Sequence, residues 1–305
     1  MKALVTGSAG FLGRHFVRAL QQRGYEVRQV DISDREPWDA RDFFRYGTTR
    51  FDLAIHCAAV VGGRQTIEGS PLELAVDLSL DAELFQWAIR TRPGRVVYIS
   101  SSAAYPVDLQ TGFWNPQLGG EPGGWKLRED YINLDNLSSP DLLYGWSKLT
   151  GEMLARHARE ADVPVTVVRP FSGYGADQDP AYPFRAFLDR ARRREDPFVV
   201  WGDGEQVRDF IHVEDVVNGT LALVEQEVDG PVNLGTGRAT SFNDLARLVC
   251  RAAGYQPQLE HQRAQPVGVR YRVADTTLLA HFYQPLVSLE AGIQAAIDPV
   301  AARAS

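Results

Sequence analysis

A tyrosine and a lysine four residues apart, Tyr144 and Lys148, have the residue types and spacing needed for proton transfer. They begin a helical pattern, so both side chains are expected on one face of a helix. A neighbouring ammonium and an oxidised nicotinamide would both favour the phenolate form of Tyr144. Such a phenolate can accept the proton of a sugar hydroxyl while a hydride leaves the carbon. The same spacing also occurs in many surface helices, so the prediction depends on its surroundings.

Three consecutive serines supply part of those surroundings. The apolar segment 96–99 predicts a buried strand, and Ser100, Ser101 and Ser102 follow it directly. Ligands of open parallel sheets bind at the carboxyl ends of the strands. A hydroxyl placed there can hydrogen-bond the reacting oxygen as charge shifts, although polar capping of a strand end is the plainer alternative. Together with the downstream tyrosine motif, the serines favour a catalytic site.

The first thirteen residues predict a site for a dinucleotide. An apolar strand, 2–6, runs into a turn with glycines at Gly7, Gly10 and Gly13, and a helix follows immediately. Gly7 allows a tight turn, Gly10 lets the backbone approach a pyrophosphate, and Gly13 lets helix and strand pack closely. The amino end of the helix then offers free N–H groups to the phosphates.

An acidic residue after the next strand favours NAD over NADP. Asp31 follows the segment 25–30, where a carboxylate can bind both hydroxyls of an adenosine ribose. The same carboxylate would repel a 2′-phosphate, although Arg35 nearby leaves NADP open. Strand, glycine triplet, helix, strand and acid in this order therefore predict NAD as the cofactor.

Strand and helix signals alternate along the first part of the chain. Strands are expected near 2–6, 26–31, 52–58, 95–100 and 164–169. This alternation predicts an α/β fold, with a Rossmann-type doubly wound parallel sheet. Too few residues separate Asp31 from Asp52 for a full crossover, so Asp39 and Ala40 are expected on a loop near the adenine end.

Beyond residue 170 the pattern changes to shorter elements with turns rich in glycine and proline. Residues 1–170 are expected to form the NAD-binding domain, with contributions from later segments, and 171–305 a smaller C-terminal α/β lobe for substrate. The elements predicted in that lobe are helix 183–194, strand 198–201, helix 212–226, strand 231–234 and helix 241–253. The long aperiodic segment 106–140 is expected to be a lid on the substrate side.

Composition excludes several functional classes. The net charge of −7 and a pI near 5.4 argue against nucleic acid or an anionic membrane as the main partner. Two cysteines, Cys57 and Cys250, give no disulfide framework and fit a reducing cytoplasm. No Cys or His pair has metal-ligand spacing, so no metal is expected. No apolar stretch is long enough to span a bilayer, and a core strand at the N-terminus leaves no room for a signal peptide.

The chain resembles the extended short-chain dehydrogenase/reductase family, in its group of NAD-dependent sugar-nucleotide epimerases and dehydratases. The resemblance runs from Lys2 to about Leu289. The matching motifs are, in order, Thr6-Gly-x-x-Gly10-Phe-x-Gly13, His56-Cys-Ala-Ala59, Tyr144-Gly-x-Ser-Lys148, Arg169-Pro-Phe171 and the segment 202–215.

The resemblance implies roles for particular residues. Catalysis is assigned to Ser101, Tyr144 and Lys148. Cofactor contacts are predicted for Gly7, Gly10, Phe11, Leu12, Gly13, Asp31, Asp39, Ala40, Cys57, Ala58, Tyr144, Lys148 and Pro170. Substrate contacts are predicted for Ser102, Ser172, Arg208 and Arg272. Arg208 would grip the diphosphate of a nucleotide sugar, since guanidinium binds phosphate oxygens in a bidentate way. A homodimer is also implied, with the helical stretches 71–91 and 141–160 as candidate faces.

Departures from the family pattern narrow the reaction. Family dehydratases and decarboxylases carry acidic residues just after the active-site serine or threonine, where this chain has Ser102 and Ala103. The double epimerase/reductase that makes GDP-fucose uses a cysteine in place of Ala103. The family usually has asparagine at the positions of Asp77 and Ser172, which suggests an unusual substrate or a slightly moved pyrophosphate.

Two reactions that need only a hydride and one proton remain. The sequence predicts an NAD-dependent nucleotide-sugar 4-epimerase that acts through a transient 4-keto intermediate, with Tyr144 as general base. The alternative is an NAD(P)H-dependent reductase of nucleotide 4-keto sugars. A non-catalytic NAD-binding regulatory protein is a third possibility, but such a protein would be expected to lose the tyrosine, the lysine or the glycine pattern.

Overall fold

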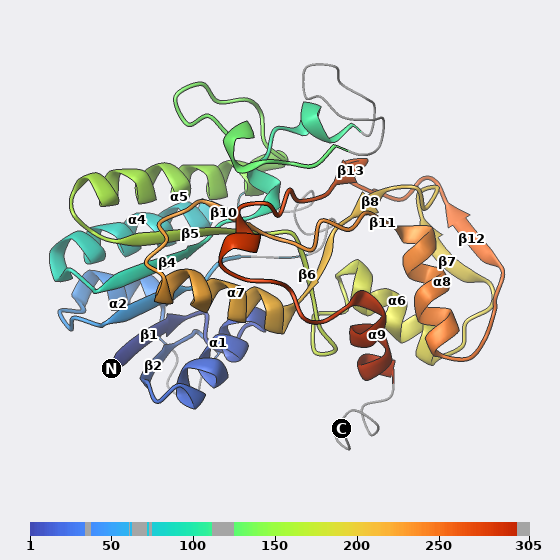
Figure 1. The fold of residues 1–305 in the computed structure, drawn as a ribbon, viewed down its shortest axis with the longest axis horizontal. Helices are drawn as coiled ribbons and strands as arrows, with labels where there is room; N and C mark the ends of the chain where they lie inside the picture. Colours follow the sequence, from blue (N-terminus) through green and yellow to red (C-terminus); the bar gives the residue numbers. More distant parts are fainter. Residues whose placement is uncertain (34–37, 61, 63–71, 73–74, 112–124, 298–305) are drawn as a thin grey trace.

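A six-stranded parallel sheet forms the centre of the molecule (Figure 1). The structure is a computed structural model that describes residues 1–33, 38–60, 62, 72, 75–111 and 125–297. The strands of this sheet are β1 (Lys2–Thr6), β2 (Glu26–Val30), β3 (Leu53–His56), β4 (Arg95–Ile99), β5 (Val165–Pro170) and β10 (Val232–Leu234). Their spatial order is β10-β5-β4-β3-β1-β2, with all neighbours parallel. The predicted Rossmann-type fold is confirmed.

The connections change direction at β1, which has β2 on one side and β3 on the other. In open α/β sheets, ligands bind at the carboxyl ends of the strands beside such a switch point. The glycine turn follows β1, and Cys57 follows β3, so both predicted cofactor segments lie at this place.

Helices cover both faces of the sheet because successive strand residues point to opposite sides. On one face, Phe16 and Leu20 of α1 (Phe11–Gln22) share a buried cluster with Leu221 of α7 (Val213–Glu225). On the other face, Phe44 and Trp87 belong to a second cluster. The helices on that face are α2 (Ala40–Tyr46), α4 (Ala75–Thr91) and α5 (Leu142–Glu160).

Up to residue 297, where its description ends, the smaller lobe consists of short strands and three helices around its own apolar core. Its strand pairs are β6 (Ser172–Tyr174) with β9 (Phe210–His212), and β7 (Phe198–Trp201) with β12 (Leu259–Gln262). A three-stranded sheet places β8 (Val207–Arg208) between β11 (Thr240–Ser241) and β13 (Tyr271–Arg272). The helices are α6 (Pro183–Arg192), α8 (Phe242–Ala252) and α9 (Leu289–Ile297), which supply most of the third buried cluster.

Two elements expected in the small lobe belong to the Rossmann layer instead. The strand β10 pairs with β5 at the edge of the central sheet, and α7 packs in the same cluster as α1. The chain therefore leaves the central layer after β5 and returns to it with α7 and β10. These are later contributions to the first domain of the kind that the sequence analysis allows for.

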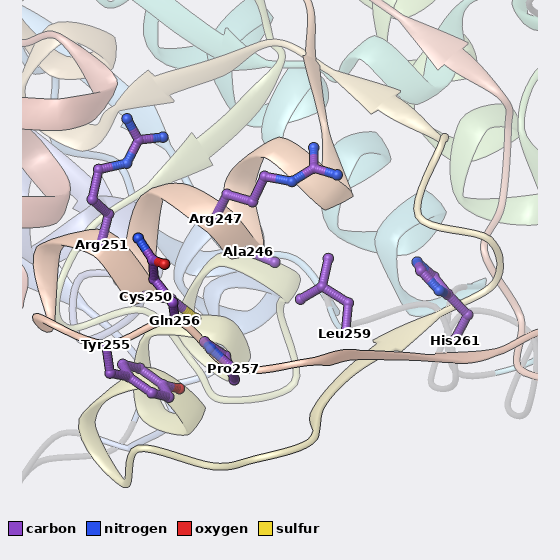
Figure 2. A pocket seen from close by; sticks show the side chains of 9 residues that line it. All are labelled: Ala246, Arg247, Cys250, Arg251, Tyr255, Gln256, Pro257, Leu259 and His261. Carbon is purple, nitrogen blue, oxygen red and sulfur yellow. The ribbon is translucent and has the colours of Figure 1, made fainter.

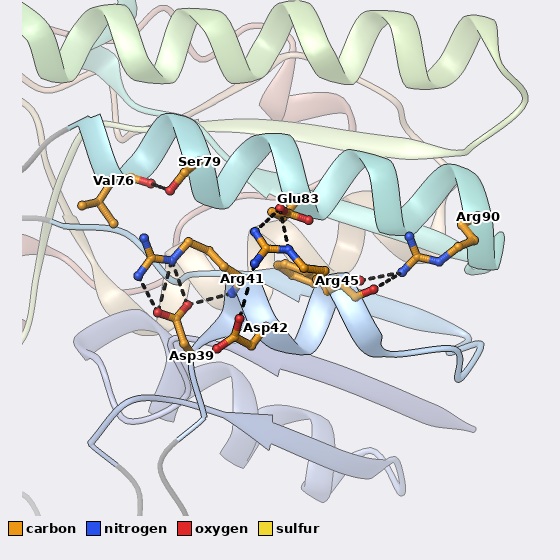
Figure 3. Close-up of polar contacts among 9 residues, drawn as sticks. Asp39, Arg41, Asp42, Arg45, Val76, Ser79, Glu83 and Arg90 are labelled. Atoms are coloured by element: carbon orange, nitrogen blue, oxygen red, sulfur yellow. Dashed lines mark hydrogen bonds and ion pairs between the residues drawn. The ribbon is translucent and has the colours of Figure 1, made fainter.

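The expectation of a loop at Asp39 and Ala40 is wrong for Ala40, whereas Asp39 lies outside the helix that follows it. Asp39 caps α2, because its carboxylate accepts a hydrogen bond from the backbone N–H of Arg41 at 2.8 Å, and Ala40 is the first helical residue. Figure 3 shows how α2 is tied to α4: Arg45 contacts Glu83 at 2.5 Å, and Arg90 donates to the carbonyl oxygen of Phe44 at 2.6 Å. The shortened crossover thus still holds a helix of seven residues.

The predicted lid is described only in part. Its described residues include the short 3-10 helices η2 (Val107–Gln110) and η3 (Glu129–Tyr131), and Leu127 bridges to Ala274 of the small lobe. Residues 112–124, like Arg35, lie outside the described residues. The lid therefore stays a prediction.

Candidate active site

The glycine turn after β1 lies directly against the end of β3. Gly7 has φ +67°, a left-handed conformation that side chains disfavour, and a Cβ there would lie 2.6 Å from backbone atoms of Cys57 and Ala58. A Cβ on Gly13 would lie 1.9 Å from the carbonyl oxygen of Gly7. Both glycines thus allow close packing of turn, helix and strand, and a larger residue at either position displaces backbone.

The amino end of α1 has the features of an anion site. Gly10 is its N-cap and has no side chain that could cap the helix. The first N–H groups, beginning at Phe11 and Leu12, are therefore available to phosphate oxygens. The first turn of α1 also contains no acidic residue that would repel them.

Asp31 is held beside this turn. Its carboxylate accepts hydrogen bonds from the backbone N–H of Ala9 at 3.0 Å and from the N–H and hydroxyl of Ser33 at 2.9 and 2.7 Å. A carboxylate fixed at the end of β2 has the position that recognition of ribose hydroxyls requires. The uncapped helix end, the close-packed glycines and the oriented Asp31 together fit a dinucleotide.

Cys57 lies at the end of β3, next to Ala58, and has no features of a nucleophile. Burial raises the pKa of its thiol to about 12, although Lys148 acts in the opposite direction. The thiol is therefore protonated at neutral pH, and only thiolates are effective nucleophiles. A packing role at the predicted cofactor site is the simpler interpretation.

Tyr144 and Lys148 lie one turn apart near the start of α5. The Nζ atom of Lys148 is 5.8 Å from the ring centre of Tyr144 and 5.6 Å from that of Tyr98. Lys148 is 4% exposed, and burial by itself would lower its pKa. The nearby Tyr144, Asp81 and Asp77 act in the opposite direction, and the pKa of Lys148 is raised overall. Lys148 thus remains an ammonium next to Tyr144.

Two buried carboxylates of α4, Asp77 and Asp81, face this ammonium. Asp81 accepts a hydrogen bond from the Tyr98 hydroxyl at 2.6 Å and lies 3.4 Å from Nε2 of His56. One oxygen of Asp77 accepts the N–H of Val60 at 2.6 Å, and the other has no hydrogen-bond partner among the described residues. Burial raises the pKa of Asp77, while Lys148 lowers it.

Asp81, Tyr98 and His56 were missed as site residues by the sequence analysis. The signal was available, since Asp81 follows Asp77 by four residues and therefore shares its helix face. Gly151 of α5 makes room for this group, because a Cβ there would lie 1.8 Å from the Tyr98 hydroxyl.

Ser101 is brought close to α5 by backbone contact. Ser101 is the N-cap of the 3-10 helix η1 (Ser102–Ala104), and its hydroxyl accepts the N–H of Ala103 at 3.1 Å. The carbonyl oxygen of Ala103 accepts the N–H of Asp141, and it would lie 2.4 Å from a Cβ on Gly145. The glycine after Tyr144 is thus required for the segments carrying Ser101 and Tyr144 to meet.

A fully buried ion pair lies beneath this junction. Arg169, in the Arg-Pro-Phe motif at the end of β5, contacts both oxygens of Glu152 in α5, at 2.9 and 2.7 Å. Glu152 also accepts the hydroxyl of Ser100 at 2.5 Å, and Arg169 donates to the Tyr105 hydroxyl at 3.1 Å. Burial by itself lowers the pKa of Arg169, but Glu152 and Tyr105 act in the opposite direction and raise this pKa overall. The pair fixes α5 against β5 and thus against Pro170.

The predicted substrate residues are placed on neighbouring short strands and on η1. Arg208 and Arg272 are register partners on β8 and β13, so their side chains leave the same face of that sheet. Arg208 donates to the carbonyl oxygens of Val207 and Val267 at 2.8 and 3.1 Å. Ser172, on β6, donates its N–H to the carbonyl oxygen of Asp209. Ser102 is buried in η1.

A separate cavity of about 650 Å³ lies in the small lobe between α8 and β12 (Figure 2). Arg247 and Arg251 come from α8, and His261 comes from the strand. None of the predicted site residues lines it. Among the described parts of the chain, no cluster of three or more metal-binding side chains occurs, and no helix has the length and apolarity to cross a membrane.

Comparison with known proteins decides the family. The family description "NAD dependent epimerase/dehydratase family" matches residues 3–235, most of the chain. The chain belongs to this family. The predicted membership of the sugar-nucleotide epimerase/dehydratase group is thereby confirmed.

Relatives of the chain have more than one activity. The dTDP-4-dehydro-6-deoxy-D-allose reductase of Streptomyces bikiniensis is 30% identical over 304 residues, covering 91% of this chain and 89% of that protein. The UDP-glucose 4-epimerase of Thermotoga maritima, solved with UDP-glucose, has a TM-score of 0.80 at 27% identity and covers 100% of both chains. That of Thermus thermophilus, solved with NAD, has a TM-score of 0.79 at 25% identity over 98% of both.

Proposed function

We propose that the protein is an NAD-dependent nucleotide-sugar 4-epimerase. The observation that carries the proposal is the Tyr144–Lys148 pair next to the segment of Ser101. Lys148 also acts on Cys57, which lies against Gly7 of the glycine turn. The residues that follow Ser101 are Ser102 and the buried Ala103, so no acid or base stands there for dehydration or decarboxylation. The NAD complex of the Thermus thermophilus relative supports the cofactor.

The chain's own residues supply proton transfer and orientation. The phenolate of Tyr144 takes the proton of the sugar 4-hydroxyl, and the Lys148 ammonium stabilises that phenolate. The Ser101 hydroxyl donates a hydrogen bond to the same oxygen as it becomes a carbonyl oxygen. NAD, when bound, supplies reversible hydride chemistry at the sugar C4. After the 4-keto sugar has turned its other face towards the cofactor site, Tyr144 returns the proton to the oxygen on C4.

A second candidate is the reduction of a nucleotide 4-keto sugar. The 30% identity with the Streptomyces bikiniensis reductase favours it. Tyr144 would then act only as a proton donor, and the reduced cofactor would be consumed once in each turnover. The position of Asp31 at the end of β2, where it repels a 2′-phosphate, supports NAD and therefore the internally balanced epimerase.

Binding residues are proposed for both ligands. The adenosine and pyrophosphate of NAD would contact the glycine turn, Phe11, Leu12 and Asp31, with Asp39, Ala40, Cys57 and Ala58 towards the adenosine and Pro170 towards the nicotinamide. Arg208 and Arg272 would bind the diphosphate of the sugar nucleotide, with Ser102 and Ser172 nearby. The UDP-glucose complex of the Thermotoga maritima relative supports this substrate class.

A panel of nucleotide hexoses incubated with catalytic NAD tests the proposal. Products are followed by mass and proton NMR, and NADH by absorbance. The expected result is a product of unchanged mass with inverted C4 and no accumulation of NADH. A nucleotide 4-keto sugar that gains two mass units while NADH or NADPH is consumed stoichiometrically would instead establish the reductase.

We also propose a homodimer through α4 and α5, in a cytoplasmic location. The two helices pack against each other, and they expose the apolar side chains of Leu78, Ile89 and Trp146 to solvent. A second copy of the chain would bury these side chains. Light scattering is expected to give twice the chain mass. A single-chain mass at micromolar concentration would contradict the dimer.

A further inference from the structure

An ion pair joins the small lobe to the start of the helix that carries Tyr144. An Nη atom of Arg272, on β13, lies 2.7 Å from a carboxylate oxygen of Asp141. The side chains are only 11% and 10% exposed, so water screens this pair far less than a surface pair. Asp141 stands three residues before Tyr144.

The carboxylate of Asp141 is committed to the arginine rather than to its own helix. Asp141 is the N-cap of α5, where aspartate ordinarily accepts an N–H of the first turn. Within the described part of α5 it makes no such side-chain hydrogen bond. Its backbone is fixed independently, because its N–H donates to Ala103 and its carbonyl oxygen accepts the N–H of Gly145 at 3.0 Å. The next residue, Leu142, has φ +57°, a conformation that persists only where surrounding contacts enforce it.

The second partner of Arg272 is Gln110, which is bonded to the segment that follows Ser101. Nε of Arg272 donates to the side-chain oxygen of Gln110 at 2.5 Å. The buried Gln110 in turn donates to the carbonyl oxygens of Tyr105 and Pro106, at 2.9 and 3.0 Å. One guanidinium is thus held by the segment that follows Ser101 and by the residue that begins the Tyr144 helix.

We infer that Asp141 is a positioning residue, which orients Arg272 and thereby couples the diphosphate end of the substrate site to the helix of Tyr144. The inference rests on the proposed function, in which Arg272 and its register partner Arg208 contact the diphosphate. Arginine binds phosphate well only when its planar fork is correctly directed. Asp141 and Gln110 fix that direction from the side of the catalytic segments.

The sign of one measurement separates this role from simple electrostatics. A carboxylate near a diphosphate repels it, so on charge alone the change Asp141→Asn should strengthen nucleotide binding. If Asp141 orients Arg272, the same change weakens it. A residue that only supports the fold would alter thermal stability without a selective effect on nucleotide affinity.

The test is calorimetric binding of UDP, dTDP, GDP and CDP to the full chain. For the nucleotide that the wild type binds best, Asp141→Asn is expected to weaken binding by about tenfold or more. Affinity for NAD is expected to stay within about twofold. The matched control is Asp135→Asn, because Asp135 pairs with Arg156 of the same helix at 2.9 Å but has an exposed side chain. That control is expected to bind nucleotide as the wild type does.

A double-substitution cycle with Arg272→Lys completes the test. Lysine keeps the charge but loses the fork, so Arg272→Lys also weakens binding, and Asp141→Asn should then add little further loss. If Asp141→Asn fails to fold, Asp141→Glu replaces it, and the longer side chain is expected to weaken nucleotide binding by misdirecting the arginine.

Equal or tighter nucleotide binding by the Asp141 variant overturns the inference, and so do additive losses in the double variant. In both cases the proposed function stands, because the wild type binds nucleotide. A wild type that binds NAD but none of the four nucleoside diphosphates overturns the proposed function and this inference together.

Discussion

Replacing Tyr144 by phenylalanine is expected to lower kcat by about 10²–10⁴-fold, the usual contribution of a positioned acid–base group. The substitution removes only the hydroxyl that moves the proton. The aromatic ring stays, and with it the packing near Lys148, whose Nζ lies 5.8 Å from the ring centre. Affinities for NAD and for nucleotide should therefore change little. Initial rates at saturating substrate, with calorimetric binding of both ligands, measure the effect.

The control for this experiment is a tyrosine outside the site. Tyr46, at the end of α2, is 71% exposed, and Tyr46→Phe is expected to leave kcat within about twofold. If Tyr144→Phe turns over at a rate near that of the wild type, another group transfers the proton, and the mechanism given above is wrong. If the wild type binds NAD but turns over no nucleotide sugar, the result supports the alternative of a non-catalytic NAD-binding regulatory protein.

The second large effect is expected on stability, from Glu152→Gln. Glu152 is the partner of the fully buried Arg169 and also accepts the Ser100 hydroxyl. Neutralising one member of a buried pair leaves the other charge uncompensated, which typically costs about 3–5 kcal/mol. Because both residues underlie the junction of β5 and α5, activity should fall together with stability. Urea denaturation monitored by circular dichroism gives the free energy of unfolding.

Two variants make this result specific. Glu160→Gln, in the same helix, removes an exposed contact with His157 and should cost about 0–1 kcal/mol. Replacing both buried partners, with Glu152→Leu and Arg169→Met, is expected to be less destabilising than Glu152→Gln alone, because no unpaired charge remains. A loss below about 1 kcal/mol for Glu152→Gln would show that the pair is not as isolated from water as its burial indicates.

The parts of the fold that depend on local sequence could be predicted well. The roles of Gly7 and Gly13 followed from spacing, and their packing has the expected form, since each lacks room for a Cβ. The buried strands of the central sheet can also be recognised from the sequence, because a strand covered on both faces is continuously apolar. The family follows from motifs distributed between Thr6 and residue 215, within the matched residues 3–235.

Features that depend on tertiary contact could not be predicted in the same way. A loop is expected at Asp39 and Ala40 because few residues separate Asp31 from Asp52. The short helix α2 is stabilised there by the cap at Asp39 and by buried Phe43 and Phe44, which are contacts that the spacing alone does not reveal. The strand β10 has only three residues, and nothing in them says which sheet they join. Glu152 is an ordinary helix residue in sequence, and only the fold gives it the buried partner Arg169.

The partners of Arg272 illustrate the same limit within the site. An arginine can be recognised from sequence as a candidate for phosphate, but its neighbours Gln110 and Asp141 are far away along the chain. The effect of Gln110 and Asp141 on the direction of the Arg272 guanidinium therefore follows only from the three-dimensional structure. The lid and the assignment of residues to NAD or substrate stay predictions.

The return of the chain to the central sheet has a consequence for how this protein can diversify. Since α7 and β10 come after the first strands of the small lobe, the two lobes are interwoven along the chain. A genetic exchange that swaps everything beyond residue 170 would also replace the edge strand β10 and the helix α7, which packs beside α1. The small lobe is therefore not a contiguous segment that could be exchanged at residue 170 without changing the central sheet.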